Sequence, residues 1–307
     1  MDDAISGAWA GTALVMAMAE TEATKARPLA RAIEGAAALD PAAKAVAKAV
    51  RGALDPGPVK DALSGTWLGH ALHPLLTDAV IGTWLSALVL DATGGDAGAS
   101  ERLIAAGVVC AVPTAVTGAT DWADAEPVGD GVRRVGAVHA VGNLAAVGLQ
   151  IASLTARRRG ARHRGVALSF AAGGLLGVTG YLGGHLSFSR GIGVDQTVFD
   201  AGAEGWTDAA AAAEVGSEPT AIVVGDTPVL LVRVGGSVMA VHDRCSHRGC
   251  SLSRGTLDGD TIQCACHASR FNLRDGRVER GPASAPQPAF DARERDGRIE
   301  LKRKPAR

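Results

Sequence analysis

Residues 245–271 read CSHRGCSLSRGTLDGDTIQCACHASRF and contain two cysteine–histidine pairs. Cys245 and His247 are separated by one residue, Cys264 and His267 by two, and sixteen residues lie between the pairs. Two thiolates and two imidazoles in mixed pairs are the ligands of one type of [2Fe–2S] cluster, in which the cysteines hold one iron and the histidines the other. The alternative is a structural zinc site, but zinc fingers usually keep like ligands together, as CxxC followed by HxxxH. The spacing therefore favours the iron–sulfur cluster.

Mixed ligation also predicts how the cluster behaves. Neutral imidazoles leave their iron less electron-rich than thiolates do, so this iron takes up the electron first. The reduction potential of such a cluster is about −150 to +300 mV, against about −400 mV for plant-type clusters held by cysteine alone. We therefore expect a one-electron centre at these four residues.

Two further cysteines, Cys250 and Cys266, stand in the same two motifs. With them the motifs read CxHxGC and CxCHxS, and they resemble the loops of the high-potential Rieske proteins of cytochrome bc and b6f complexes. Low-potential Rieske ferredoxins and oxygenases have other residues at both places. The resemblance implies a Cys250–Cys266 disulfide that ties the two loops over the cluster. The alternative is a pair of buried thiols that pack as small apolar side chains.

The same resemblance implies roles for two residues next to the second motif. Ser269 matches the serine that donates a hydrogen bond to a bridging sulfide in high-potential members. Phe271 stands where those members often carry a tyrosine that bonds to a cysteine sulfur, and phenylalanine has no hydrogen to donate. One potential-raising hydrogen bond is missing, so we expect a potential below that of respiratory-complex Rieske centres and above that of plant ferredoxins.

Residues 206–307 have the pattern of an all-β domain. Short apolar runs recur at 221–224, 228–234 and 237–243, and Gly-Asp and Gly-Gly turns separate them. The segment FNLRDGRVERGP predicts a hairpin around Asp275–Gly276. Gly281–Pro282 resembles the proline-bearing loop that covers the cluster in Rieske proteins. These patterns favour a complete Rieske domain over an isolated motif.

The first two thirds of the chain contain four apolar stretches, and each is long enough to cross a hydrocarbon core of about 30 Å. They are roughly His70–Leu90, Leu103–Thr120, Val135–Leu154 and Val166–Leu186. Small residues dominate them, which suits helices that pack closely in lipid. The alternative is a buried helical bundle of a soluble protein, which the flanking arginine clusters and tryptophans disfavour. We expect a multi-domain chain, with an all-α four-helix transmembrane bundle followed by an all-β Rieske domain.

The helical region resembles a known membrane-domain family whose role is uncharacterised. The matching landmarks are GTWLGHALHPLLTDAVIGTW (65–84), TGATDW (117–122), HAVGN (139–143) and GYLGGHLSFSRGIGV (180–194). The expected domains are an Ala-rich helical tail at 1–60, the transmembrane domain at 61–190, a linker at 191–205 and the Rieske domain at 206–307. Within the tail, the apolar run Ala4–Ala19 lacks the basic start of a signal peptide, and Asp55–Pro58 predicts a break.

Four histidines near the ends of the predicted spans are candidate functional residues: His70, His73, His139 and His185. The order of the spans brings all four near one leaflet, on the side where the Rieske domain follows. Three interpretations stay open. In the first, two of these histidines bind the iron of a haem b. In the second, the histidines form part of a quinone site. In the third, their hydrogen bonds are made by backbone carbonyls and by Asp78 or Asp121.

Charge indicates the orientation and limits the partners. The loop TARRRGARHRG (155–165) should be cytoplasmic by the positive-inside rule, which places the Rieske domain of a multi-pass cell-membrane protein outside. An oxidising outer side also suits the expected disulfide. The formal net charge is −1, and no basic patch is interleaved with aromatic residues, so we expect no nucleic acid. The expected partners are the lipid bilayer and an unidentified redox protein or quinone.

These observations favour a membrane-anchored one-electron carrier of the oxidoreductase type, which exchanges electrons with a haem or quinone in the membrane domain. One alternative is an electron donor to a partner oxygenase. Another is a redox-sensing or structural membrane protein. A self-contained oxygenase is disfavoured, because no His-x4-His pair with a later aspartate, as a mononuclear iron site would need, follows the cluster motifs.

Overall fold

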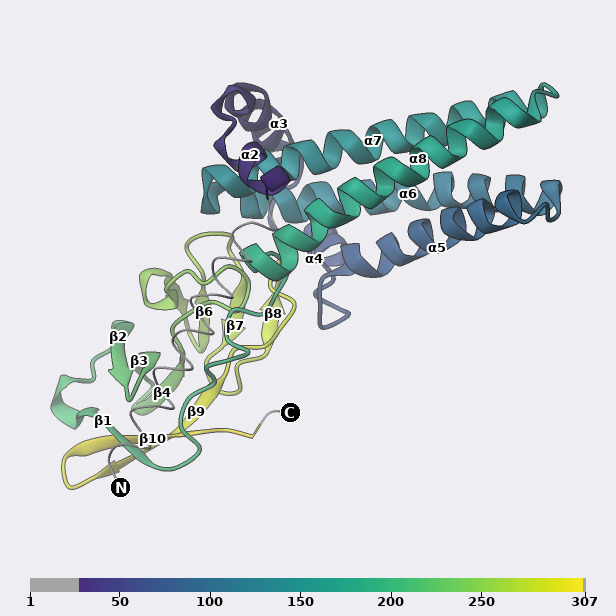
Figure 1. The fold of residues 1–307 in the computed structure, drawn as a ribbon. Helices are drawn as coiled ribbons and strands as arrows, with labels where there is room; N and C mark the ends of the chain where they lie inside the picture. Colours follow the sequence, from purple (N-terminus) through teal and green to yellow (C-terminus); the bar gives the residue numbers. More distant parts are fainter. Residues whose placement is uncertain (1–27, 306–307) are drawn as a thin grey trace, which may run out of the picture.

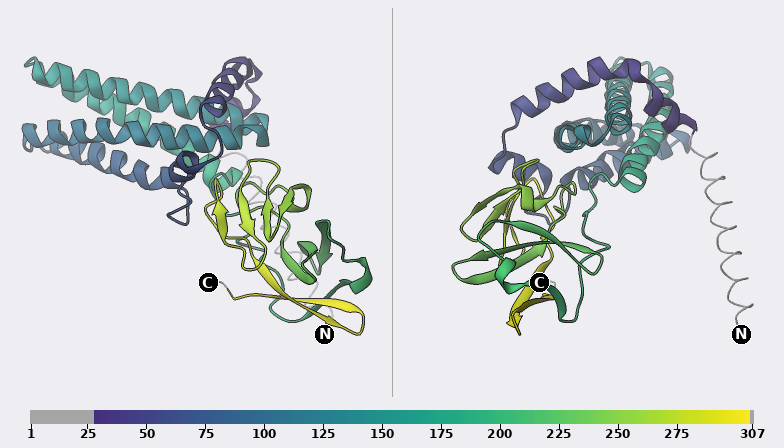
Figure 2. Two further views of the ribbon diagram at one scale, coloured as in Figure 1. Left: turned by 180° about the vertical axis from the view of Figure 1, so that it is seen from behind. Right: turned by 90° about the vertical axis from the view of Figure 1, so that its left-hand side faces the viewer.

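A computed structural model describes residues 28–305, which form a long helical bundle and a β domain at one end of it (Figure 1). The expected helix at Ala4–Ala19 lies outside the described residues. The expected order, helices first and strands after, is confirmed. Figure 2 shows the β domain beneath the bundle end at which the shorter N-terminal helices also gather.

The bundle consists of four long helices, α5 (Leu72–Ala92), α6 (Ala97–Ala125), α7 (Asp130–Arg158) and α8 (Arg162–Gly184). They confirm the four predicted spans, and each is long and apolar enough to cross a membrane. α8 continues into a π-helical turn, His185–Ser189. Large apolar side chains on the outer faces are highly exposed, which suits contact with lipid better than contact with water. Examples are Val109, Val112, Val141 and Leu144.

Three shorter helices, α2 (Pro28–Gly35), α3 (Asp40–Ala53) and α4 (Pro58–Ser64), precede the bundle. α2 packs on α7, and α3 packs on α6 and α7. Asp40 accepts two hydrogen bonds of 2.8 Å from the guanidinium of Arg134 on α7. These residues therefore pack on the bundle rather than forming a loose tail. The helical structure is interrupted between α3 and α4, as predicted from Asp55–Pro58. The expected domain boundary at residue 60 falls inside α4.

The β domain contains two antiparallel sheets. The larger has the strand order β1-β10-β9-β4-β3-β2, and the smaller has the order β5-β6-β7-β8. The strands are β1 (Thr207–Ala211), β2 (Thr220–Val224), β3 (Thr227–Val234), β4 (Ser237–His242), β5 (Thr256–Asp258), β6 (Thr261–Gln263), β7 (Arg270–Asn272), β8 (Val278–Arg280), β9 (Ala289–Arg295) and β10 (Arg298–Arg303). The predicted runs correspond to β2, β3 and β4, and the predicted hairpin joins β7 to β8.

The core between the two sheets reaches the candidate ligands. Leu230, Ile262 and Phe271 are fully buried, and Cys245 and Cys264 belong to the same cluster of buried side chains. Cys245 follows β4 closely, and Cys264 follows β6 directly. The sheets therefore hold the start of each candidate ligand loop, while the histidines lie further out.

Candidate metal centre

The two ligand loops, residues 245–250 and 264–269, have the same backbone hydrogen bonds. In the first loop the amide of Cys245 donates to the carbonyl of Cys250 at 2.8 Å, and in the second the amide of Cys264 donates to the carbonyl of Ser269 at 2.8 Å. Each loop therefore closes on its own cysteine. The two loops present equivalent positions to each other, although one spacing is Cys-x-His and the other Cys-x-x-His.

The fifth residue of each loop makes the tight turn. The amides of Gly249 and Ala268 donate to the carbonyls of Cys245 and Cys264, at 2.8 and 3.0 Å. Both residues have a left-handed backbone conformation, with φ of 76° at Gly249 and 61° at Ala268. Glycine adopts this conformation freely, whereas alanine is strained there. The left-handed conformation of Ala268 therefore costs free energy, which the other contacts of the second loop must offset.

The loops bring the four predicted ligands together. Cys245 and Cys264 are both 2% exposed and are not in a disulfide. The rings of His247 and His267 have centroids 5.0 Å apart and are nearly perpendicular. Nδ1 of His247 is buried and has no hydrogen-bond partner. A buried imidazole nitrogen without a partner, next to two free thiols, is the donor set that a [2Fe–2S] cluster with mixed ligation requires.

The protonation of these groups also fits a cationic occupant. The hydrogen bond from the Cys245 thiol lowers the pKa of Cys264 to about 6. The same bond and burial raise the pKa of Cys245 well above its ordinary value. Burial lowers the pKa of His267 and, with the neighbouring Arg248, also lowers that of His247, so both rings are neutral. A bound metal would take up both sulfurs as thiolates, and neutral imidazole is the form that binds iron.

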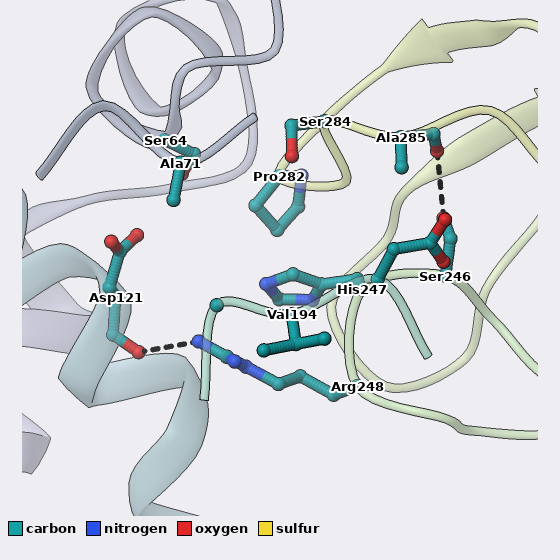
Figure 3. A pocket seen from close by; sticks show the side chains of 12 residues that line it. Ser64, Ala71, Asp121, Val194, Ser246, His247, Arg248, Pro282, Ser284 and Ala285 are labelled. Carbon is teal, nitrogen blue, oxygen red and sulfur yellow. Dashed lines mark hydrogen bonds between the residues drawn. The ribbon is translucent and has the colours of Figure 1, made fainter. Parts of the chain in front are cut away.

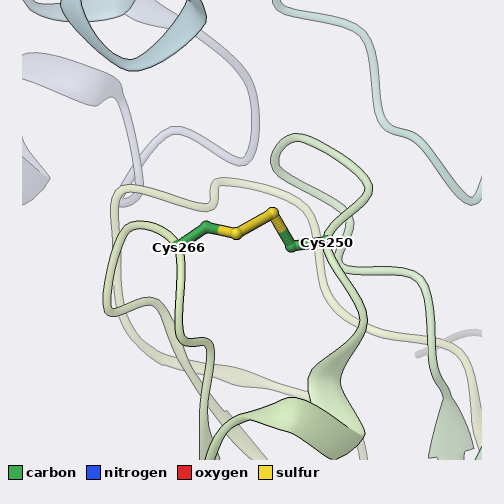
Figure 4. The surroundings of a disulfide bond; sticks show 2 residues. All are labelled: Cys250 and Cys266. Carbon is green, nitrogen blue, oxygen red and sulfur yellow. A yellow bond between two sulfur atoms is a disulfide. The ribbon is translucent and has the colours of Figure 1, made fainter. Parts of the chain in front are cut away.

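The disulfide Cys250–Cys266 is present and links the two loops, as Figure 4 shows. Its two sulfur atoms and that of Cys264 all lie within 4.8 Å of one another. Because both disulfide sulfurs are already bonded, this group of three is not a metal site of its own. The disulfide instead fixes the loop ends directly beside one ligand.

The structure also places the two predicted tuning residues. Ser269 is fully buried, and its hydroxyl oxygen accepts the amide of Ala283 at 3.0 Å, which leaves the hydroxyl hydrogen free to donate. Phe271 is fully buried in the core between the sheets. Their predicted effects on the potential stay predictions.

The histidine side of the loops rests on the helical domain. The side chain of His247 is only 11% exposed, and its Nε2 lies 3.8 Å from Oδ2 of Asp124 on α6. Oδ1 of Asp124 accepts a hydrogen bond of 2.7 Å from Lys60 on α4, and both of these side chains are buried. This arrangement could not be predicted from the sequence, because it joins α4, α6 and a loop of the β domain.

Further contacts join the two domains around this point. Arg248 donates to the carbonyl of Asp121 on α6 at 3.2 Å, and Thr66 donates to the carbonyl of Ala283 at 3.1 Å. Gly281 lies so close to α4 that a Cβ there would be 2.2 Å from the Thr66 hydroxyl, so this contact requires a glycine. The proline-bearing loop, expected to cover the cluster, thus also contacts the helices.

A small cavity lies between the cluster loops and α6 (Figure 3). Its volume of about 30 Å³ is room for one or two water molecules. The side chain of Asp121 and the ring of His247 both point into it, and Pro282 closes one side. His247 therefore faces a small space that residues of both domains line.

The four membrane-domain histidines do not form a single cluster. His70 is exposed in the turn before α5, where its Nδ1 lies 3.0 Å from the carbonyl of Ala71. His185 lies in the π-helical turn, and its Nε2 is 2.8 Å from Oε1 of Glu34 on α2. Burial would raise the pKa of Glu34, but hydrogen bonds from Arg190 and His185 outweigh it and lower that pKa.

His73 and His139 lie inside the bundle. Nδ1 of His73 is 3.0 Å from the carbonyl of Thr114, and Nδ1 of His139 is 2.8 Å from that of Thr179. The expected backbone carbonyls are therefore present, whereas Asp121 faces the cluster loops instead and Asp78 is exposed. A role in binding haem or quinone stays a prediction.

Comparison with known proteins gives two family matches. Residues 205–291 match the Rieske [2Fe-2S] domain family, and residues 69–196 match a family described as predicted membrane protein (DUF2231). The two matched ranges correspond to the β domain and to the bundle.

Several relatives of the β domain are ferredoxins. Ferredoxin CarAc of Metapseudomonas resinovorans is 38% identical over 76 residues, which cover 25% of this chain and 71% of that protein. The anthranilate 1,2-dioxygenase ferredoxin subunit of Burkholderia cepacia is 32% identical over 84 residues, 27% of this chain and 78% of that subunit. Among solved structures, the ferredoxin of carbazole 1,9a-dioxygenase from Nocardioides aromaticivorans IC177 is 29% identical, with a TM-score of 0.31, over 32% of this chain and 98% of that one.

Proposed function

The chain belongs to the Rieske [2Fe–2S] family through its β domain, and we propose that it is a membrane-anchored one-electron carrier whose cluster exchanges electrons across the face that rests on the helical domain. Cys245 and Cys264 would hold one iron, and His247 and His267 the other. When bound, the cluster supplies a centre that takes up and releases one electron at a time.

The residues around the ligands would keep this centre fixed and dry. The disulfide ties the loop ends, and the core between the sheets holds the two cysteines. The hydroxyl of Ser269, whose oxygen is already engaged by Ala283, has its hydrogen free for a cluster sulfide. Such a bond favours the more negative reduced state.

One observation carries the proposal: the histidine edge, the outer side of the cluster ligands, lies against α6. Nε2 of His247 is 3.8 Å from Asp124, and Arg248 donates to the carbonyl of Asp121. A carrier that served only soluble partners would present this edge to solvent. Contact with α6 instead supports a donor or acceptor at the membrane domain, and a lipid-soluble quinone is the class we propose.

The orientation is part of the same proposal. The α7–α8 loop, with its run of arginines, lies at the far end of the bundle from the β domain (Figure 1). By the positive-inside rule the arginines stay in the cytoplasm, so the cluster would be extracytoplasmic. Fusions of alkaline phosphatase and of a fluorescent protein to the C-terminus test this: only the phosphatase fusion should be active.

The electron route can be tested by locking the domains together. Ser284 follows Ala283, whose carbonyl accepts the hydrogen bond from Thr66, and lines the cavity between the domains. Thr66→Cys with Ser284→Cys, joined by a short bifunctional thiol reagent, therefore locks the domains together, and each single variant treated with the same reagent is its control. In liposomes, a hydroquinone should reduce the cluster as fast in the locked protein as in the single variants, as followed by the EPR signal of the reduced cluster. Loss of this reduction only in the locked protein, or its absence in all of them, would contradict the proposal.

A second candidate is an electron donor to a partner oxygenase. It is favoured by the names of the relatives, which are ferredoxin components of dioxygenases. Such a partner would need the histidine edge uncovered, so the β domain would have to leave α6. The locked protein separates the two functions, because it should then lose electron transfer to a soluble one-electron acceptor while the single variants keep it.

A further inference from the structure

The two hairpins of the bundle, α5–α6 and α7–α8, are built alike around an imidazole. His73, the second residue of α5, bonds to the carbonyl of Thr114 on α6. His139, nine residues after the start of α7, bonds to the carbonyl of Thr179 on α8. One turn later, a polar side chain in each hairpin donates back to the histidine carbonyl: Thr77 at 2.9 Å and Asn143 at 3.0 Å.

The likeness continues toward the far end of the hairpins. Trp84 and Gln150 stand at the same distance in sequence from their histidines, and both bond to the second helix of their own hairpin, Trp84 to the carbonyl of Ile104 at 3.3 Å and Gln150 to the hydroxyl of Ser169 at 2.9 Å. Further on, a serine hydroxyl bridges the two helices in each hairpin: Ser100 to Ala87 at 3.5 Å and Ser153 to Gly165 at 2.6 Å. Contacts repeated at matching positions indicate two copies of one unit.

Equivalent residues of the two units meet inside the bundle. Asp91 and Arg157 occupy the same place in α5 and α7, and they form a hydrogen bond of 3.0 Å with their side chains 0% and 1% exposed. α5 and α7 therefore face each other across the core. His73 lies on the same stripe of α5 as the buried Trp84 and Asp91, at the opposite end.

His139 lies on the matching stripe of α7, with Gln150 and Arg157. The two imidazoles therefore belong to one layer of the core.

Each ring is prepared to act as a ligand. A carbonyl facing Nδ1 fixes the tautomer with hydrogen on Nδ1 and a lone pair on Nε2, as in histidines that bind metals. A glycine lies beside each ring: a Cβ would be 2.6 Å from His73 at Gly118 and 3.0 Å from His139 at Gly183. Larger residues at these places would displace the imidazoles.

The side chains next to the rings decide which metal centre fits. The polar side chains that contact them, among the described residues, are the hydroxyl of Thr117 at 3.5 Å from His73 and the amide of Asn143 at 3.1 Å from His139. Neither is the thiolate or carboxylate that usually completes a zinc or copper site. A haem brings four ring nitrogens of its own and needs only axial ligands, for which imidazole is a common choice.

We propose that His73 and His139 are the two axial ligands of a haem in the core of the bundle. The amide of Asn143 would turn away from Nε2 of His139 when the iron binds. On α6, Gly118 lies less than two turns from Asp121 and Asp124, so the haem would lie close beneath the cluster loops. The proposal adds a second centre to the proposed carrier and does not depend on that function, because haem binding can be measured without the cluster.

The test uses the full-length protein, purified in detergent from cells supplied with a haem precursor. Pyridine haemochrome analysis should give about one haem per chain, and the reduced-minus-oxidised spectrum should show a b-type band. His73→Ala and His139→Ala should each lose the haem, while the exposed His70→Ala and the Glu34-bound His185→Ala should keep it. Protein with an intact cluster but without haem would overturn the proposal.

Two further measurements separate loss of a ligand from loss of the fold. Added imidazole should restore the b-type spectrum to His73→Gly, which a merely misfolded variant would not show. Cys264→Ser should lose the cluster EPR signal and keep the haem, so failure of one centre is distinguished from failure of the other. Haem retained in both His73→Ala and His139→Ala would also contradict the assignment.

Discussion

The cluster loops and the helical bundle are both pairs of similar units, but the units are joined in different ways. The ligand loops of the β domain are short, closed by their own backbone hydrogen bonds and linked by a covalent disulfide. The hairpins of the bundle are long and held together by packing and by the buried Asp91–Arg157 pair. In the first case the ligands are fixed by a few neighbouring residues. In the second, His73 and His139 are held in place by contacts along the whole length of the helices.

This difference determines how far a substitution acts. A change in a ligand loop should affect the cluster and leave the bundle intact, since each loop closes on itself. A change in the bundle core should lower the stability of the whole helical domain, because no single bond sets its geometry. The residues between the two regions, Lys60 and Asp124, should affect the cluster through charge alone.

The largest effect is expected for a cluster ligand. Cys264→Ser removes one of two thiolates on the same iron, so the cluster should be lost while the helical content is unchanged. EPR of the reduced protein and its iron content measure this. Cys110→Ser, which removes the free cysteine of α6, is the control and should keep the full signal. A zinc-loaded and iron-free wild type would refute the cluster assignment.

Arg157→Met should have the next largest effect, on the bundle alone. It leaves Asp91 buried, with Arg162 at 3.6 Å as its remaining partner. Breaking a buried ion pair costs about 3–5 kcal/mol, and removing both charges restores much of it. Thermal unfolding in detergent should show the loss in Arg157→Met and its recovery in the double variant with Asp91→Leu. Arg158→Met, which removes an exposed neighbour, should change little, and a reduced cluster signal in Arg157→Met would contradict the separation of the two regions.

Charges at the contact between the regions should shift the potential in opposite directions. The carboxylate of Asp124 disfavours the added negative charge of the reduced cluster, and the ammonium of Lys60 favours it. Asp124→Asn should therefore raise the midpoint potential and Lys60→Met should lower it, by on the order of 60 mV, a tenfold change in a one-electron equilibrium. Asp130→Asn, an exposed carboxylate at the same end of the bundle, is the control. Shifts of the same sign in both variants would show that they act through structure rather than charge.

The smallest effect is expected where the two loops differ. Ala268 has the left-handed conformation that Gly249 adopts at the matching place. Ala268→Gly should stabilise the β domain, and Gly249→Ala should destabilise it, each by about 1 kcal/mol. Denaturant-induced loss of the cluster signal measures both. If both variants changed the stability in the same direction, the left-handed backbone would not be what distinguishes the two loops.

The sequence was most informative where the chemistry is local. The four ligands, the disulfide partners and Ser269 all lie within residues 245–269, so a short motif specifies them together. The four long helices were also predictable, because length and hydrophobicity alone identify a span. Their ends were not, since α6 and α7 each continue beyond the apolar stretch into polar turns.

The contact between the domains could not be predicted, because it joins residues that are far apart in sequence. Arg248 bonds to Asp121 and Thr66 to Ala283, each more than a hundred residues away. The repeat of the hairpins was hidden for a different reason. Equivalent positions of the two hairpins carry different residue types, as Trp84 and Gln150 do. The histidines are among the few positions that have the same residue in both hairpins.

The disulfide has a consequence for how the protein is made. Four thiols from two short loops lie together, and a bond between Cys245 and Cys264 would consume both thiolates that the iron needs. If the cluster is inserted while all four are reduced, only Cys250 and Cys266 remain free to oxidise. In that order of events the metal would act as the protecting group that selects the correct cysteine pair.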